Sequence, residues 1–130
     1  NKKGNLLVSF FFNIKKFNLS IKKLTKINCL LVKKLLSKYY KKKITFKAPN
    51  DLLINNKKIC GILQETIVNK DQRYLIIGIG INVVKSPYIK NYPTTNLFEI
   101  TGKKLNYIML VNILKSIFEK YFSRYYKQKI

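Results

Sequence analysis

The spacing of apolar residues divides the chain into short strands and two long helices. Residues 6–12 (LLVSFFF) are an almost continuous run of strand-forming residues, which predicts a strand buried on both faces. Between residues 20 and 40 apolar positions recur at steps of three and four, which predicts an amphipathic helix with Ser20 or Asn18 as its N-cap. The residues expected on its core face are Ile21, Leu24, Ile27, Leu31, Leu35 and Tyr39.

The middle of the chain has the pattern of antiparallel hairpins. Alternating or short apolar runs predict strands at residues 44–47, 52–54, 58–66 and 74–83. Pro49 ends the first run. Asn55-Asn56 separates the next two runs and predicts a tight turn, because asparagine tolerates positive φ angles. Residues 69–72 predict a second turn.

The last third of the chain predicts a loop followed by a helix. Residues 85–104 contain two prolines and are expected to form the loop, and the helix is expected from about Asn106. The residues expected on its core face are Ile108, Val111, Leu114, Phe118, Phe122 and Tyr125. Together the elements predict an α+β fold, with a mixed, largely antiparallel sheet and helices packed against it.

Composition narrows the class of protein. With 130 residues and 47% hydrophobic content, the chain has room for one domain with a modest core. The sequence has no histidine, which excludes Ser-His and Cys-His catalysis and most zinc sites. Cys29 and Cys60 lie in apolar patterns and predict reduced core residues of a cytoplasmic protein, with a disulfide as the alternative. No apolar run approaches the roughly 18 residues of a membrane span.

The net charge of +22 raises the question of nucleic-acid binding. Only two of the 27 basic residues, Arg73 and Arg124, are arginine, whereas lysine, asparagine, isoleucine, phenylalanine and tyrosine are abundant together. These residues have A/T-rich codons, so a base-composition bias explains their joint excess. Selection for phosphate and base contacts would enrich arginine too. We therefore expect a solvated lysine surface, and nucleic-acid binding is the less favoured alternative.

The run Gly78-Ile79-Gly80-Ile81-Asn82 is unusual for a strand. Glycine weakens strands and marks either a bend or a ligand that lies against the backbone. A dinucleotide-binding fingerprint does not fit, because Val83 stands where a third glycine belongs and no helical pattern follows. A strand bent around a neighbouring helix is the structural alternative. Asn82 favours a ligand, since a side-chain amide can read a base edge through paired hydrogen bonds.

A second candidate site lies around the Asn-Asn turn. Lys47, Asp51 and Lys58 come together if the hairpin closes, and Gly61 removes a side chain beside them. Two ammonium groups, one carboxylate and a bare strand suit a small substrate that carries a carboxylate and a phosphate. The alternative is that Lys57 and Lys58 are solvated turn residues.

Four segments, in order along the chain, resemble motifs of biotin protein ligases. KAPND (47–51) is similar to KWPND, KKICGILQE (57–65) to K(K/R)xxGILxE, GIGIN (78–82) to GxGxN, and TTNLFE (94–99) to ATSLxE. Lipoate ligases share the fold in outline, but the hairpin motifs resemble the biotin branch. The resemblance covers nearly the whole chain. It implies a biotin protein ligase catalytic domain, with an α+β fold like that of class II aminoacyl-tRNA synthetases.

The resemblance also implies a role for each matching residue. Lys58 is implied to contact the biotin carboxylate and the α-phosphate, Lys47 to lie near the ATP phosphates, and Asp51 to assist with metal or with the incoming lysine. The implied binding residues are Gly61 and Leu63 in the biotin pocket, Gly78 and Gly80 beside the ligand, and Asn82 at the adenine. No protein metal ligand is assigned with certainty; Mg²⁺ is implied through ATP, and Asp51 is its candidate contact.

The implied activity is a two-step ligation. Biotin and Mg-ATP form biotinyl-5′-AMP, and a lysine of a biotin carboxyl carrier protein domain then takes the biotinyl group. The implied partners are therefore biotin, ATP and the carrier domain, with neither a membrane nor nucleic acid. Exposed sheet edges leave a homodimer as an open alternative.

Two departures from the family pattern affect these expectations. Ala48 replaces the tryptophan of KWPND, which removes a large packing group beside Lys47 and Asp51. Residues 1–130 also lack the Gly/Arg-rich GRGRxGR biotin loop and the C-terminal SH3-like domain. The resemblance therefore implies an N-terminally truncated, partial catalytic domain that holds about half of an active site. The alternative is an inactive remnant that acts only as a binding module.

Overall fold

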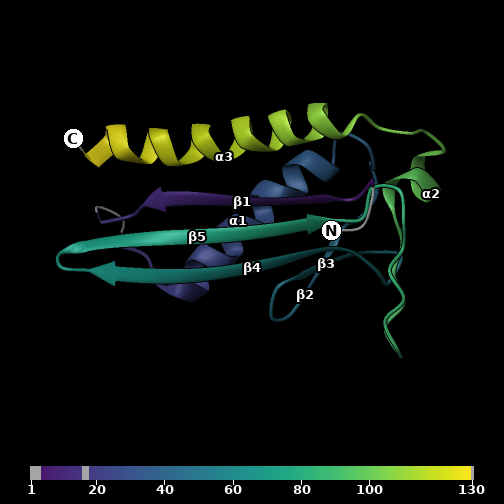
Figure 1. Ribbon diagram of the computed structural model, residues 1–130, viewed down its shortest axis with the longest axis horizontal. Coiled ribbons are helices and arrows are strands. Elements are labelled where there is room, and N and C mark those ends of the chain that lie inside the picture. The colour runs from purple at the N-terminus through teal and green to yellow at the C-terminus, as the bar shows by residue number, and fades with distance from the viewer. Residues whose placement is uncertain (1–3, 16–17, 130) are drawn as a thin grey trace.

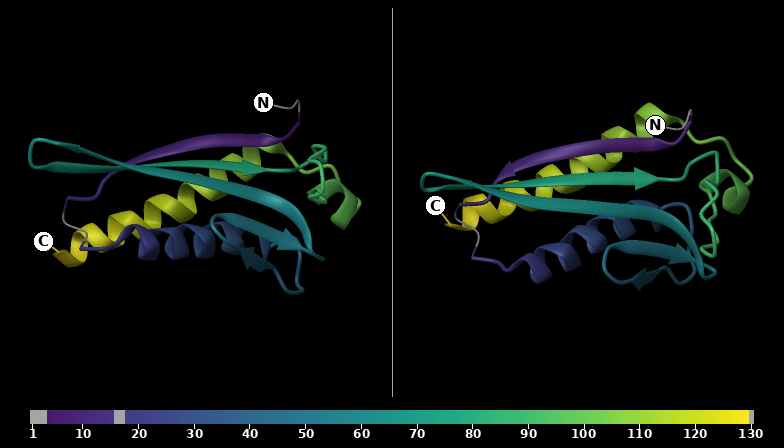
Figure 2. Two further views of the ribbon diagram at one scale, coloured as in Figure 1. Left: turned by 90° about the horizontal axis from the view of Figure 1, so that it is seen from below. Right: turned by 60° about the horizontal axis from the view of Figure 1, so that its bottom comes forward.

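The computed structural model is built on a five-stranded sheet that carries its long helices on one face (Figures 1 and 2). It describes residues 4–15 and 18–129. In chain order the elements are β1 (Leu6–Asn13), α1 (Ile21–Leu36), β2 (Thr45–Lys47), β3 (Asp51–Ile54), β4 (Lys57–Asn69), β5 (Gln72–Ile81), α2 (Leu97–Thr101) and α3 (Tyr107–Lys129). The strands lie in the order β1-β5-β4-β3-β2, and each neighbouring pair is antiparallel. This arrangement confirms the predicted α+β fold class.

Both predicted hairpin turns form where the sequence places them. Asn55 and Asn56 adopt φ angles of 51° and 61°, the left-handed values that the tight β3–β4 turn requires. In the β4–β5 hairpin Asn69 pairs with Gln72, so the turn between them has two residues. Because this hairpin stays paired to its tip, β4 is longer than the predicted strand at residues 58–66.

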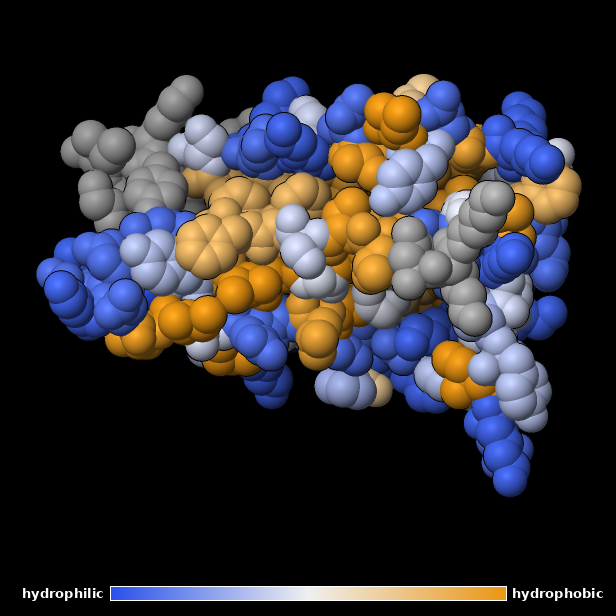
Figure 3. All heavy atoms as spheres, viewed as in Figure 1, coloured by the Kyte–Doolittle hydropathy of each residue, from blue (hydrophilic) through white to orange (hydrophobic). Residues whose placement is uncertain are grey.

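Within residues 4–15 and 18–129 the long helices cover only one face of the sheet, so the prediction that residues 6–12 are buried on both faces is wrong. In β1, Leu6 is buried whereas Leu7 and Phe11 are 57% and 61% exposed. Helices α1 and α3 lie on the side of the sheet that takes Leu6 (Figure 2). The continuous apolar run of β1 therefore forms one packed face and one bare face. Figure 3 shows apolar atoms spread across the bare face.

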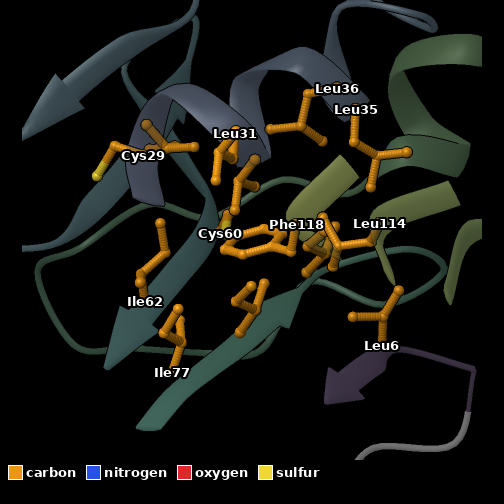
Figure 4. Close-up of a cluster of buried hydrophobic side chains, with 14 of the residues drawn as sticks. Leu6, Cys29, Leu31, Leu35, Leu36, Cys60, Ile62, Ile77, Leu114 and Phe118 are labelled. Carbon is orange, nitrogen blue, oxygen red and sulfur yellow. The ribbon is translucent and has the colours of Figure 1, made fainter. Parts of the chain in front are cut away.

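The core lies between the covered face of the sheet and the two long helices (Figure 4). Ser20 is the N-cap of α1, because its hydroxyl accepts a hydrogen bond from the Lys23 N–H at 3.2 Å. Side chains from both helices and three strands meet in this core: Leu6, Leu31, Leu35, Ile62, Ile77, Leu114 and Phe118. Among the described residues, no helix has both the length and the hydrophobicity needed to cross a lipid bilayer.

Two residues predicted for the core lie at the surface. Ile21 stands at the start of α1 and is 47% exposed, and Ile108 in the first turn of α3 is 69% exposed. The buried stripe of α3 begins instead at Leu110 and recurs every four residues at Leu114 and Phe118, which places Ile108 on the opposite side of the helix. The side chain of Tyr125 lies outside the described residues.

The predicted loop at residues 85–104 contains a short helix that the pattern did not indicate. This helix, α2, follows Asn96, whose Oδ1 accepts a hydrogen bond from the Glu99 N–H at 2.8 Å. Gly102 ends it with a φ of 73°. A helix of five residues is too short to produce a recurring apolar spacing, which explains why it was missed.

The two cysteines are unpaired and buried, as the sequence predicts. Burial raises the pKa of the Cys29 thiol to about 11 and raises the pKa of Cys60 further. Both thiols are therefore held in the neutral form and pack as small apolar side chains.

Candidate functional site

An irregularity at the start of β4 decides which way Lys58 points. Consecutive β3 residues pair with Cys60 and then with Lys58, so Ile59 is an extra residue in the ladder. This β-bulge turns both Ile59 and Cys60 into the core, where they are 0% and 1% exposed. Lys58 and Gly61 consequently share the other face, although a regular strand places residues three apart on opposite faces.

Lys58 forms an ion pair with Asp51 directly above Gly61. The Lys58 Nζ lies 3.5 Å from the Asp51 Oδ1, and the two side chains are 25% and 14% exposed. A Cβ at position 61 would lie 3.3 Å from both Cε and Nζ of Lys58 and 3.6 Å from the Asp51 Oδ1. The absence of a side chain at Gly61 therefore leaves the space that the Lys58–Asp51 ion pair occupies.

Tyr92, in the loop between β5 and α2, completes the cluster. Its phenol donates a hydrogen bond of 2.6 Å to the Asp51 Oδ2. The Lys47 Nζ lies over its ring, 4.0 Å from the centroid, and the Lys58 Nζ lies 5.6 Å from the same point. Burial, followed by the hydrogen bond to Asp51 and its charge, raises the pKa of Tyr92 to about 12. Tyr92 was not predicted, because in the sequence it is only an aromatic residue in a loop that contains prolines.

The same loop is attached to the backbone of Lys58. The Lys58 N–H donates to the Pro93 carbonyl and the Thr95 N–H donates to the Lys58 carbonyl, each at 2.9 Å, which makes a parallel bridge between Lys58 and Thr94. The Asn82 Nδ2 also donates to the Lys58 carbonyl, at 3.3 Å. Strand β5 ends at this position, so the loop continues the pairing along β4.

Asn5 fixes the end of β5 and was not recognised from the sequence. Its Oδ1 accepts hydrogen bonds from the N–H groups of Val83, Val84 and Lys85, each at 3.0 Å, and its Nδ2 donates to the Lys85 carbonyl at 3.0 Å. Asn5 is 6% exposed, so these bonds are shielded from water. They hold the chain immediately after Asn82 in place.

Four of the eight predicted site residues, Lys58, Gly61, Gly80 and Asn82, line one cavity of about 230 Å³ on the bare face of the sheet. The cavity is lined by Asn5, Leu6, Leu7, Lys58, Gly61, Gly80, Ile81, Asn82, Pro87, Ile89 and Thr94. Asp51 and Lys47 adjoin it through Lys58 and Tyr92. Gly78 and Leu63 are not among its lining residues; a Cβ on Gly78 would lie 3.9 Å from the Leu63 Cβ. A larger groove of about 790 Å³ between α1 and α3 contains none of the predicted site residues.

The charges of this cluster suit an anionic ligand. Two ammonium groups, from Lys47 and Lys58, face one carboxylate, so the cluster keeps a net positive charge beside a surface without side chains. The donors do not fit a protein-held Mg²⁺ ion. Within residues 4–15 and 18–129 no group of three or more Asp, Glu, His or Cys side chains could hold a metal. Both oxygens of Asp51 are already engaged, by Lys58 and Tyr92.

Comparison with solved structures identifies the class of fold. A biotin protein ligase from Aquifex aeolicus in complex with biotin and ATP matches with a TM-score of 0.71 and 34% identity, over 89% of this chain and 49% of that protein. The apo structure of the Aquifex aeolicus enzyme gives a TM-score of 0.75 at 30% identity, over 95% and 55% of the two chains. A Leishmania major biotin protein ligase in complex with biotinyl-5-AMP gives 0.69 at 24% identity, a likeness of fold alone. The fold is that of a biotin protein ligase catalytic domain.

The sequence comparison then identifies the family. The profile of the biotin/lipoate A/B protein ligase family matches residues 1–82, and the chain belongs to that family. The bifunctional ligase/repressor BirA of Bacillus subtilis is 38% identical over 86 residues, which are 61% of this chain and 26% of that relative. The chain thus spans about a quarter of the Bacillus protein and about half of the solved Aquifex ligase.

Proposed function

We propose that this chain supplies the lysine-bearing part of a biotin protein ligase active site, and that residues 1–130 are part of the catalytic domain. The observation that carries the proposal is the Lys58–Asp51 pair, with 3.5 Å between Nζ and Oδ1, set above Gly61 at the cavity. Membership of the ligase family and the likeness to a ligase that binds biotin and ATP support these two molecules as substrates.

In the first step a carboxylate oxygen of biotin attacks the α-phosphorus of ATP, and pyrophosphate leaves with the electrons of the broken P–O bond. Because one anion approaches another, the barrier depends on a cation fixed at the point of approach. Lys58 meets this requirement, since Asp51 orients its ammonium and its side chain lines the cavity. Gly61 and Gly80 leave the backbone bare, so the ligand can lie close to the sheet.

In the second step the amine of a carrier-protein lysine attacks the acyl carbon of biotinyl-5′-AMP, and AMP leaves. The amine loses a proton, and Asp51 is the carboxylate beside Lys58 that can accept it. Only 14% of the Asp51 side chain is exposed, and Lys58 and Tyr92 hold its two oxygens. Its first role is therefore to orient Lys58, and proton acceptance is its second.

In this proposal Lys47 and Asn82 bind the nucleotide. The ammonium of Lys47 is exposed and lies on the Tyr92 ring, where it can meet the phosphates. The Asn82 amide donates to the Lys58 carbonyl, so its side chain is held at the wall of the cavity with its oxygen left to accept from adenine.

The test compares Lys58→Ala with Lys57→Ala in the full-length polypeptide. Lys58→Ala should reduce adenylate formation by roughly a hundredfold or more, the effect of losing one oxyanion-hole donor. Lys57 is exposed and does not line the cavity, so Lys57→Ala should change little. Pyrophosphate release reports the first step, and biotinylation of a carrier domain reports the second.

Synthetic biotinyl-5′-AMP separates the two steps. If Lys58 acts mainly in adenylation, supplying this intermediate should restore much of the carrier labelling by Lys58→Ala. Equal losses from both lysine substitutions would mean that the pair contributes only general surface charge, and the assigned mechanism would be wrong. An unsubstituted polypeptide that neither releases pyrophosphate nor labels the carrier would instead be the inactive remnant.

A further inference from the structure

Lys47 and Asp51 are neighbours that do not pair. They are directly opposite each other in the β2–β3 ladder, the position at which oppositely charged side chains ordinarily attract. Within the described residues, however, Asp51 forms its ion pair with Lys58, and the Lys47 Nζ lies over the Tyr92 ring instead. The two side chains therefore do not form the ion pair that their register allows.

Tyr92 contacts both side chains, Lys47 and Asp51, that such a pair would join. Its phenol donates to the Asp51 Oδ2 at 2.6 Å, while Lys58 approaches the other oxygen, so each oxygen of Asp51 already has a partner. Its ring face holds the Lys47 ammonium at 4.0 Å by a cation–π contact, which attracts the cation without cancelling its charge. The neutral side chain of Tyr92 thus contacts a carboxylate through its hydroxyl and a cation through its ring.

We propose that Tyr92 is a positioning residue that prevents Lys47 from pairing with Asp51 and thereby keeps the Lys47 charge available to the phosphates of the nucleotide. This inference rests on the proposed function for its substrate. If Lys47 paired with Asp51, the carboxylate would be shared between two lysines, and the positive charge facing the ligand would decrease. The Tyr92 phenol, whose pKa is raised to about 12, is a protonated donor at neutral pH, as an ordinary tyrosine also is.

The position of Tyr92 is fixed by backbone bonds. The adjacent residue Pro93 accepts from the Lys58 N–H, and Thr95 donates to the Lys58 carbonyl, each at 2.9 Å. Thr94 further donates its hydroxyl to the Pro87 carbonyl at 2.7 Å, which closes the loop on itself. The segment that carries Tyr92 is therefore attached to the residue whose ammonium it helps to place.

The first test measures the coupling of Lys47 to Asp51 without any enzyme assay. Urea unfolding of Lys47→Met, Asp51→Asn and their double variant gives this coupling as the departure from additivity. The coupling should be more favourable in a Tyr92→Leu background than when Tyr92 is present. Equal coupling in both backgrounds would overturn the proposal. Tyr88 of the same loop is 88% exposed, so Tyr88→Leu is the matched control and should leave the coupling as it is in the wild type.

The second test separates ATP from biotin in the pyrophosphate-release assay. Tyr92→Leu should raise the KM for ATP about tenfold, the scale of one hydrogen bond or contact to a charged group, and change the KM for biotin less than twofold. Tyr92→Phe keeps the ring and should have a smaller effect, and Tyr88→Leu should have none. A Tyr92→Leu enzyme with both KM values unchanged, or with both raised equally, would contradict the role given to Tyr92. If neither the wild type nor any variant is active, the proposed function fails. The coupling measurement still decides whether Tyr92 keeps Lys47 from pairing with Asp51.

Discussion

Substituting Gly61 by alanine is the most discriminating test of the site geometry, because it should separate activity from stability. The added Cβ would lie 3.3 Å from Cε and Nζ of Lys58, whereas ordinary carbon contacts are about 3.5–4.0 Å. Lys58 must therefore move by a few tenths of an ångström. It can do so at little cost, because the atoms contacted are the end of a flexible side chain that is 25% exposed.

Gly61→Ala is expected to raise the stability of the fold and to lower the rate of catalysis. Replacing a strand glycine by alanine removes backbone entropy from the unfolded chain, so the free energy of unfolding should rise by up to about 0.5–1 kcal/mol. Adenylate formation should fall by up to roughly tenfold, since a misplacement of about 1 Å costs about a hundredfold and Lys58 is displaced by a few tenths of an ångström. Urea unfolding and pyrophosphate release measure the two quantities on the same preparation.

Two other glycines provide a graded comparison for Gly61→Ala. A Cβ on Gly80 would be 3.9 Å from the Leu7 Cδ1, an ordinary contact, so Gly80→Ala would only take space from the cavity that Gly80 lines. A Cβ on Gly78 would be 3.7 Å from the Leu63 carbonyl oxygen and outside the lining residues. Activity should therefore decrease in the order Gly78→Ala, Gly80→Ala, Gly61→Ala. Wild-type adenylation by Gly61→Ala would refute the packing of Lys58 over Gly61.

Two further predictions concern stability. Asn5→Ala leaves three backbone N–H groups at Val83–Lys85 without their acceptor. It should lower the free energy of unfolding, measured by urea titration, by on the order of 2–4 kcal/mol. Asn5→Asp keeps the acceptor and should lose less stability. The Cys29 thiol has a folded pKa of about 11 against an ordinary 9.0, so the folded state binds more protons between these values. Stability should therefore fall as the pH rises from 9 to 11, and Cys29→Ser should reduce this slope; an unchanged slope would show that the thiol does not contribute to it.

The sequence predicted the elements that depend on local pattern. The Asn55-Asn56 turn follows from the tolerance of asparagine for positive φ, and Ser20 begins α1 because its hydroxyl can accept from the first turn. The choice between one and two buried faces for β1 was wrong, because Leu7 and Phe11 are as apolar as Leu6. Apolar content alone does not tell whether a second layer covers a strand.

The candidate site could be predicted in its residues but only partly in its geometry. Lys58, Gly61, Gly80 and Asn82 were named from motifs, and the structure brings all four to one cavity. Strict alternation would place Lys58 and Gly61 on opposite faces, and only the extra residue in the β3–β4 ladder brings them together. Tyr92 was missed because its side-chain partners Lys58, Asp51 and Lys47 are 34, 41 and 45 residues away, so no local spacing indicates the contact.

The bulge in β4 has a consequence for how the site moves. It lies where β5 ends, and there the N–H and C=O of Lys58 are bonded to the loop at Pro93 and Thr95, each at 2.9 Å. Displacement of the loop must break both of these bonds, while Lys58 stays paired with Leu53 of β3. Local opening of the loop is therefore coupled to the order of Lys58. An open loop would hold the Lys58 ammonium less firmly, and any ligand that orders the loop would also help to fix Lys58 in place.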